Sequence, residues 1–377
     1  MRTSANGQIS VRQFTILIIL GVIGDSILVL PTVIASFAKQ DAWISMLIAG
    51  LLGVGTGWLY AFIASRMGRK SFVETAQSKL GFVMGTVIAA LFLMEVFYCS
   101  ITLISEVGQF LTTQMMPETP LNAVLVLFVF VVIVAYRYGI EAFARMGELL
   151  FPVFLALFLF LVIFLLPQVE TSNLKPFMVE GMGPIAQGVL RAYVQGFTEM
   201  VILLMLTPYV KSGTKLTKPI VTGYAIGGLI LFILIIMCVL VLGPNLMVTK
   251  YYPTFVLAQK ITIGKFLERL EMVLTFLWII SVFFKTTMLY YGLTTGISQL
   301  LRLKESGMMT IPLGMILTVC TIISTPSITE YNQILIYYYP WFDIVFCVAL
   351  PLLFLTALTV FARRKPSSMA GSRPNKP

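Results

Sequence analysis

The chain has 377 residues, of which 58% are hydrophobic and only 11% are charged. Soluble domains contain about 25% charged residues, so this chain has too few charges to cover the surface of a soluble protein. The composition excludes a cytosolic globular enzyme and a disordered or fibrous chain. Recurring apolar runs of about twenty residues instead predict an all-α polytopic membrane protein.

The formal charge of +10 and the absence of histidine narrow the function further. In a membrane protein, surplus Lys and Arg lie on cytoplasmic loops, so we expect a lipid bilayer and no nucleic acid as a partner. Histidine-based catalysis and His-ligated metals are excluded. The four cysteines lie inside apolar runs without metal-ligand spacing, which predicts small core residues and neither a metal nor a cofactor.

The apolar runs predict ten transmembrane helices, punctuated by prolines at most of the joins. The predicted spans are 11–37, 42–65, 82–114, 120–137, 145–166, 184–209, 218–243, 270–301, 308–325 and 340–362. Residues 66–81 are polar and predict a short helix along the cytoplasmic face, and 244–269 form the longest outer connection. We expect one membrane domain over 1–365 and a disordered basic tail over 366–377.

Orientation follows from the positive charges. With the N-terminus inside, the inner segments hold 18 Lys and Arg and the outer segments hold 6. This difference predicts that both termini are cytoplasmic, in agreement with an even number of spans.

Two of the predicted helices carry a matched interruption. In span one, Gly24 and Asp25 lie about halfway along, and in span six Gly196 is followed by Thr198 and Glu199. Glycine weakens a helix and lets the backbone approach a ligand, and a carboxylate at this depth needs a partner or a purpose. Because the breaks are five spans apart, they predict a five-plus-five inverted repeat with broken helices 1 and 6. The repeats would cover about 11–166 and 184–362, with the binding site at the breaks.

Span three presents one polar helical face. Its members recur at helical spacing and are Glu95, Tyr98, Cys99, Thr102 and Glu106. The stripe predicts either a cavity wall with a proton or water path, or a structural seam satisfied by neighbouring helices. We expect Tyr98 and Thr102 to line a cavity, and Glu95 and Glu106 to belong to a polar relay or ion pair.

Span eight places Lys285 near the membrane midplane, where an ammonium needs a carboxylate. Asp25, Glu95 and Glu199 are the candidate partners. Thr287 and Tyr291 share a second face of the same helix. A purely structural pair between Lys285 and an acid remains the alternative to a functional one.

Several short motifs together resemble the B subunits of spore germinant receptors, the endospore germination permease family. The motifs are Gly21-x-x-Gly24 leading to Leu30-Pro31, Gly139-Ile140-Glu141 with Arg145 and Glu148, Tyr252-Pro253, and Arg269-x-Glu271 with Trp278 and Phe284-Lys285. The resemblance covers about residues 8–365. It implies the fold of the amino acid–polyamine–organocation superfamily, which is the five-plus-five repeat with broken helices one and six.

The resemblance also implies a role and a location. Such subunits lie in the spore inner membrane, bind a small germinant that is often an amino acid, and act with an A subunit and a C-subunit lipoprotein. It carries the binding role to Gly24, Asp25, Tyr98, Thr102, Thr198, Glu199, Thr287 and Tyr291.

We therefore expect a ligand sensor on a transporter scaffold. An ordinary proton- or sodium-coupled amino acid symporter is the first alternative, because a sensor and a carrier share such a site. A passive channel subunit with ion flux along the stripe from Glu95 to Glu106 is another. A membrane enzyme is disfavoured because the chain has no histidine and no clustered catalytic group.

Overall fold

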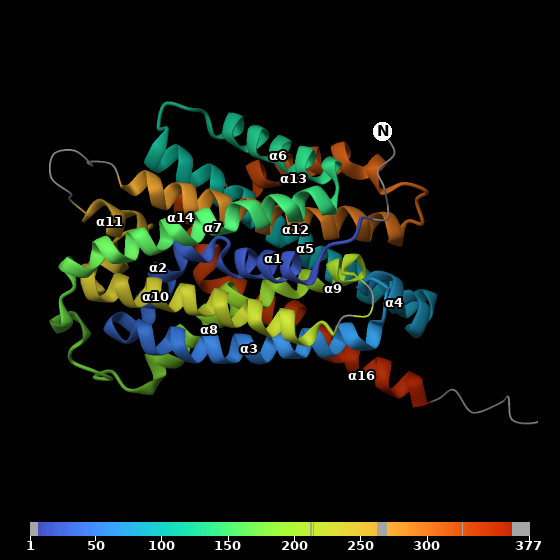
Figure 1. The fold of residues 1–377 in the computed structure, drawn as a ribbon, viewed down its shortest axis with the longest axis horizontal. Coiled ribbons are helices and arrows are strands. Elements are labelled where there is room, and N and C mark those ends of the chain that lie inside the picture. Colours follow the sequence, from blue (N-terminus) through green and yellow to red (C-terminus); the bar gives the residue numbers. More distant parts are fainter. Residues whose placement is uncertain (1–6, 212, 214, 262–269, 326, 364–377) are drawn as a thin grey trace, which may run out of the picture.

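A computed structural model describes residues 7–211, 213, 215–261, 270–325 and 327–363, with side chains up to 360. Regular structure in these residues is helical, apart from one isolated bridge that pairs Ile9 with Val210. The long helices lie side by side in an elongated bundle (Figure 1).

The helices of the first half are α1 (Val11–Ile23), α2 (Ser26–Ala38), α3 (Ala42–Met67), α4 (Phe72–Leu80), α5 (Phe82–Phe110), α6 (Leu121–Tyr138) and α7 (Ile140–Leu165). Those of the second half are α8 (Met182–Phe197), α9 (Leu203–Leu206), α10 (Thr217–Thr249), α11 (Pro253–Gln259), α12 (Glu271–Leu300), α13 (Thr310–Ser324), α14 (Ile328–Gln333), α15 (Tyr339–Asp343) and α16 (Leu350–Arg363).

The described residues contain 9 helical segments that are long and apolar enough to cross a membrane. The first of these, Ser26–Met67, joins α2 to α3, whereas α1 is a shorter apolar helix of its own. When α1 and α2 are taken as one interrupted crossing and α3 as the next, the bundle has ten crossings, as predicted. Large apolar side chains such as Val83 and Leu149 are exposed on its outside, where lipid would cover them.

Crossings one and six are both interrupted, which confirms the predicted broken helices. Between α1 and α2, Gly24 adopts a positive φ of 32° and starts a turn that ends the first helix. In crossing six, α8 gives way at Phe197 to the 3₁₀ segment η5 (Thr198–Ile202), which α9 follows. The two interrupted crossings lie together, because α2 packs along α8.

The tenth crossing begins earlier than predicted. It starts at Ile328 rather than near 340, so Pro340 lies inside it and not at a join. Its first part contains two π-helical segments, η8 (Ile334–Tyr338) and η9 (Ile344–Ala349), on either side of α15. Polar residues and a run of tyrosines hide this part from a hydropathy pattern. The fifth crossing likewise begins at Ile140 rather than 145.

The two ends of the bundle carry different short helices. In Figure 1, α1 begins and α16 ends at the end of the bundle that carries α4, and α11 lies at the opposite end. The predicted surface helix over 66–81 is therefore confirmed as α4, which begins with a capping box formed by Ser71 and Glu74. The outer connection packs through α11 against α2, α10 and α12, also as expected. The predicted tail over 366–377 lies outside the described residues. The cytoplasmic orientation and the repeat boundaries remain predictions.

Small residues on α10 bring it close to crossing one. A side chain at Gly227 would place its Cβ 2.8 Å from Cβ of Val22, and one at Gly223 would lie 2.5 Å from Ile18. Helices in membranes associate through such close contacts, because lipid supplies no hydrophobic driving force. The position of α1, and with it the break at Gly24, depends on this packing.

We predict that Gly227→Val destabilises the protein by about 1–3 kcal/mol, the usual cost of overpacking a close contact. Gly55→Val on α3 is the control, since a Cβ there meets nothing within 4 Å. The thermal unfolding midpoint of the detergent-solubilised protein is the measurement. An equal change in both variants would contradict the packing argument.

Candidate functional site

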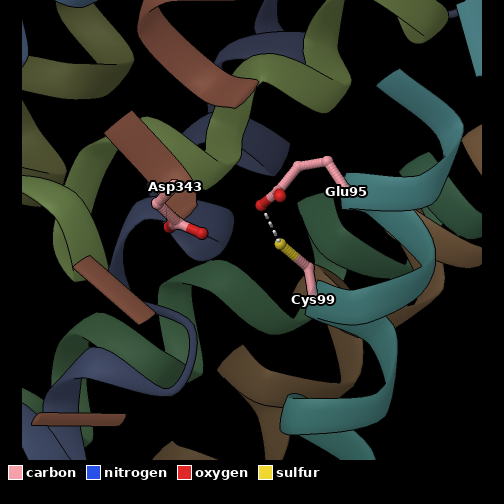
Figure 2. Close-up of side chains that lie close together, drawn as sticks. All are labelled: Glu95, Cys99 and Asp343. Atoms are coloured by element: carbon pink, nitrogen blue, oxygen red, sulfur yellow. Dashed lines mark hydrogen bonds between the residues drawn. The ribbon is translucent and has the colours of Figure 1, made fainter. Parts of the chain in front are cut away.

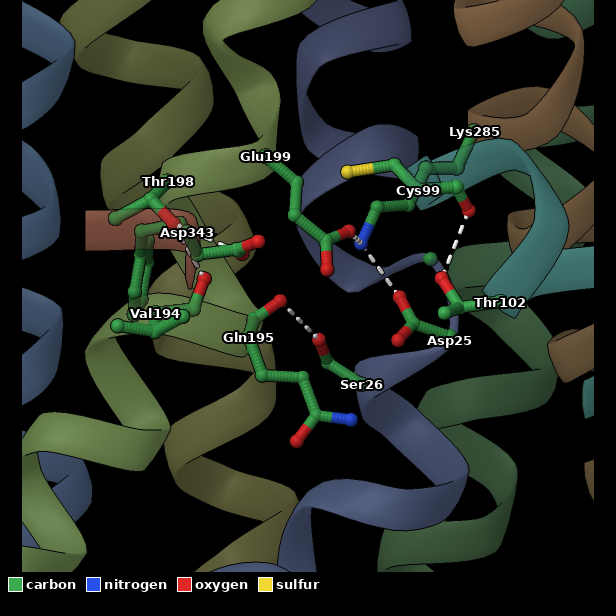
Figure 3. Close-up of polar contacts among 12 residues, drawn as sticks. Asp25, Ser26, Cys99, Thr102, Val194, Gln195, Thr198, Glu199, Lys285 and Asp343 are labelled. Carbon is green, nitrogen blue, oxygen red and sulfur yellow. Dashed lines mark hydrogen bonds and ion pairs between the residues drawn. The ribbon is translucent and has the colours of Figure 1, made fainter. Parts of the chain in front are cut away.

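Two clusters of polar side chains lie in the buried interior, one around Glu95 (Figure 2) and one around Lys285 (Figure 3). The second cluster is an ion pair that joins three crossings. Lys285 on α12 donates a hydrogen bond of 2.5 Å to Asp25, which stands between α1 and α2. The same ammonium lies 2.5 Å from Oε2 of Glu199 in η5, without the alignment of a hydrogen bond. All three side chains are at most 3% exposed.

The backbone at the break in crossing one is shaped to receive this lysine. A Cβ at Gly24 would lie 2.3 Å from Cδ of Lys285, so the lysine stem fills the space that a side chain would need. Ser281, one turn before Lys285, donates a hydrogen bond of 2.7 Å to the carbonyl of Gly24. We expected this glycine to let the backbone approach a ligand, but in the structure the group that approaches it is Lys285.

The two breaks are also bonded to each other. The hydroxyl of Ser26, the first residue of α2, donates a hydrogen bond of 3.2 Å to the carbonyl of Gln195 on α8. At the end of α8, the hydroxyl of Tyr60 donates to the carbonyl of Thr198 at 2.9 Å. Carbonyls that the interruption of a helix leaves free thus find hydroxyl donors from neighbouring helices.

The first cluster contains Glu95, which was one of three candidate partners of Lys285; Lys285 pairs instead with the other two, Asp25 and Glu199. Cys99 donates to Oε1 of Glu95 at 3.1 Å, and Cys347 from η9 does so at 3.5 Å. Asp343 of α15 completes the group: one ligand atom each of Glu95, Cys99 and Asp343 lie within 4.8 Å of one another. All four side chains are at most 1% exposed.

Two hydrogen-bonded links connect the clusters. The hydroxyl of Tyr339 donates to Glu199 at 2.7 Å and also contacts the sulfur of Cys99 at 3.2 Å. The hydroxyl of Thr198 donates to the carbonyl of Val194 at 2.8 Å and also lies 3.5 Å from Oδ2 of Asp343. A continuous chain of polar contacts thus extends from Asp25 through the break in crossing six to the cluster on α5.

The remaining predicted residues fall into different surroundings. The ring of Tyr98 stands over Tyr339 with centroids 5.8 Å apart, and so borders the connected clusters. Thr102 is buried and donates to the carbonyl of its own helix at Cys99. Thr287 is fully buried, with no hydrogen-bond partner for its hydroxyl among the described residues.

Tyr291 and Glu106 make no hydrogen bond to the ion pair, although Glu106 is close enough to Asp25 and Lys285 to interact with their charges. Tyr291 packs on Tyr136 with ring centroids 4.5 Å apart, beside the connection from α6 to α7. Glu106 accepts hydrogen bonds from Trp278 at 3.2 Å and from Tyr331 at 3.0 Å. Both oxygens of Glu106 are thus satisfied, as in a structural seam.

The residues that the sequence did not reveal come mainly from crossing ten. A span starting near 340 has Tyr339 and Asp343 at its outer end, whereas the crossing begins at Ile328 and carries both inward. Asp343 is an acid within the predicted span 340–362, and this is the signal that could have identified it. Gln195 directly precedes Gly196 at the second break and is a further residue that the sequence pattern did not single out. Both polar atoms of its side chain are buried without a hydrogen-bond partner among the described residues.

The connected clusters carry more negative groups than positive ones. Asp25, Glu95, Glu199 and Asp343 are buried with a single ammonium, that of Lys285. Burying an uncompensated charge costs several kcal/mol, so such a site attracts protons or cationic groups. The arrangement therefore suits recognition of a small molecule with a positive group.

Two solved structures share the fold. The crystal structure of MhsT in complex with L-phenylalanine aligns with a TM-score of 0.71 and 14% identity, over 95% of this chain and 90% of that one. Mhp1, a nucleobase-cation-symport-1 family transporter in a closed conformation with bromovinylhydantoin bound, aligns with a TM-score of 0.59 and 13% identity. That alignment covers 96% of this chain and 94% of Mhp1. The chain thus has the fold of these transporters, with crossings one and six broken.

Curated relatives align over most of the sequence. Spore germination protein KB of Bacillus subtilis (strain 168) is 28% identical over 98% of this chain and 99% of its own. Spore germination protein YndE of the same organism is 26% identical over 80% of this chain and 83% of its own. Spore germination protein XB of Bacillus anthracis is 26% identical over 73% of this chain and 77% of its own.

The family described as spore germination protein matches residues 8–329. This match covers most of the chain, and the motifs that suggested the resemblance lie largely within it. The protein is an integral membrane protein that belongs to the spore germination protein family.

Proposed function

We propose that this protein senses a small nutrient, an amino acid, during spore germination. The nutrient binds at the breaks in crossings one and six. Binding is passed to an A subunit and a C-subunit lipoprotein in the spore inner membrane. The single observation that carries the proposal is the Lys285 ammonium held between Asp25 and Glu199, one at each break.

The chemistry of this ion pair suits an amino acid. The α-ammonium of the ligand is the same kind of group as the ammonium of Lys285, so it can take the place between Asp25 and Glu199. Lys285 is then released to meet the ligand carboxylate, and Asp25, Glu199 and Lys285 each keep a partner of opposite charge. The uncommitted amide of Gln195 and hydroxyl of Thr287 supply further hydrogen bonds near the breaks.

Such an exchange gives the ligand a way to change the protein. In the described structure, Lys285 holds α12 to both interrupted crossings. A ligand that replaces this contact binds one arrangement of these helices better than another, which is what a population shift requires. The altered helices then present a different surface to the partner subunits.

The proton-coupled amino acid symporter remains the second candidate, because the fold is that of transporters. Two measurements separate the proposals. Spores lacking the gene are tested for germination with amino acids, sugars and nucleosides, and the purified protein in proteoliposomes is tested for uptake of the active compound. Loss of response to one nutrient, with binding but no uptake, supports the sensor, whereas uptake by the protein alone supports the carrier.

We predict that Glu199→Gln raises the nutrient concentration needed for half-maximal germination about ten- to hundredfold. A hydrogen bond to a charged group is worth about 1.5–3 kcal/mol, and the variant removes the charge that the ligand ammonium would meet. Glu118→Gln, in an exposed turn, is the control and leaves the response unchanged. An unshifted response in Glu199→Gln spores would exclude this residue from the site.

We further predict that Lys285→Met lowers stability by about 3–5 kcal/mol, because it leaves two buried carboxylates without their cation. The triple variant Asp25→Asn, Glu199→Gln, Lys285→Met removes the charges together and is expected to unfold nearer to the wild-type temperature. Thermal unfolding of both purified variants in detergent checks this. If the triple variant unfolds at a temperature no higher than that of Lys285→Met, the loss of stability does not come from unpaired buried carboxylates.

A further inference from the structure

The cluster around Glu95 brings together four potential ligands from two distant parts of the chain. Glu95 and Cys99 lie one turn apart on α5, while Asp343 and Cys347 lie one turn apart at the junction of α15 and η9. Figure 2 shows the carboxylates of Glu95 and Asp343 and the sulfur of Cys99 pointing toward one another. Each pair has i,i+4 spacing, which places both of its side chains on the same face of a helix.

Each of the two carboxylates has an oxygen that accepts no hydrogen bond from another described side chain. Oε2 of Glu95 and Oδ1 of Asp343 are buried and receive no hydrogen bond from a donor group of another described residue, while the two carboxyl groups lie close enough to share a proton. The ammonium of Lys285 already pairs with Asp25 and Glu199, so it is not available here. Two carboxyl groups in an apolar interior therefore require either protons or a cation of their own.

We propose that Glu95, Cys99, Asp343 and Cys347 bind a divalent metal ion of the zinc class. Zinc is held by four ligands drawn from cysteine sulfur, histidine nitrogen and carboxylate oxygen, and this chain offers two sulfurs and two carboxylates. The sulfurs disfavour magnesium and calcium, which take oxygen ligands. A divalent ion offsets two of the four negative charges that two carboxylates and two deprotonated thiols bring to the site.

The spacing of the ligands is compatible with such an ion. Bonds of about 2.0–2.3 Å place tetrahedral ligand atoms about 3–4 Å apart. The sulfurs of Cys99 and Cys347 lie 3.1 and 3.5 Å from Oε1 of Glu95, and one ligand atom each of Glu95, Cys99 and Asp343 lie within 4.8 Å of one another. Cys347 is not part of that tighter group, so side-chain rotations of Asp343 and Cys347 toward the other two ligands would complete the set.

Outer partners hold the ligands in place. Tyr339 contacts Cys99 through its hydroxyl, and the hydroxyl of Thr198, which donates to the carbonyl of Val194, lies 3.5 Å from Oδ2 of Asp343. Such second-sphere hydrogen bonds are typical of metal sites. Since Thr198 begins the interruption of crossing six, a bound ion would tie α5 and α15 to that break. The metal site does not depend on the nutrient proposal and is tested without any nutrient.

The experiment uses the full-length protein purified in detergent. After dialysis against a buffer with zinc and then without, we expect one zinc ion per chain by elemental analysis, and a higher unfolding temperature than for the metal-free protein. Replacing zinc with Co²⁺ is expected to give a sulfur-to-cobalt charge-transfer absorption in the near ultraviolet and the visible bands of tetrahedral cobalt.

Variants locate the ion. Cys99→Ser with Cys347→Ser is expected to abolish the charge-transfer absorption, and Asp343→Asn to weaken cobalt affinity at least about tenfold while keeping that absorption. Cys320→Ser on α13 and Cys238→Ser on α10 are matched controls that change neither measurement, since both cysteines lie on other helices.

The wild-type protein alone can overturn the proposal, even if a variant fails to fold. Absence of bound zinc together with a cobalt spectrum that lacks sulfur ligation would exclude the site and leave a protonated carboxyl pair. A cobalt spectrum that is lost in Cys320→Ser or Cys238→Ser would place the ion elsewhere and equally exclude it.

Discussion

A single buried ammonium organises the centre of this membrane protein. Lys285 reaches Asp25 and Glu199, which stand at the interruptions of two different crossings. An interrupted helix leaves backbone groups without their usual partners, and in a membrane interior such groups need hydrogen bonds from neighbouring side chains. Ser281, Ser26 and the lysine meet this need, so the breaks and the ion pair stabilise each other.

The same constraint explains the small residues around the ion pair. Gly24 has no side chain because the stem of Lys285 passes there, and Gly227 has none because α10 must approach α1 closely. The lysine reaches its partners only if α1 and α12 remain close enough. Packing at some distance from the site thus determines whether the charges meet.

The sequence predicted the architecture well because the membrane imposes simple rules. Apolar runs must be about twenty residues long, and charges within them need partners, so ten crossings and the two breaks followed directly. Of three candidate partners for Lys285, two are correct. Burial does not separate Glu95 from the others, since all three acids are buried on different elements and only the tertiary contacts decide which of them meet Lys285.

What the sequence did not predict depends on helix irregularity and on tertiary contact. The π-helical segments on either side of Asp343 extend crossing ten past Pro340 and move that acid into the interior. Glu95 and Cys347 are 252 positions apart, so no spacing rule could pair them. Tyr291 shares a helical face with Thr287. At its own level along α12, however, it packs against Tyr136 of α6 and not against the breaks.

The tethered nature of the central cation bears on the choice between a sensor and a carrier. A carrier driven by a mobile cation uses that ion to neutralise its acids in one state and releases it in another. Here the ammonium is part of the chain, so it compensates Asp25 and Glu199 without leaving the protein. In the proposed mechanism a ligand ammonium displaces it, and the displaced charge stays inside and meets the ligand carboxylate. Such an exchange converts occupancy into a change of helix contacts without moving an inorganic ion, which is the property that a nutrient sensor on a transporter scaffold requires.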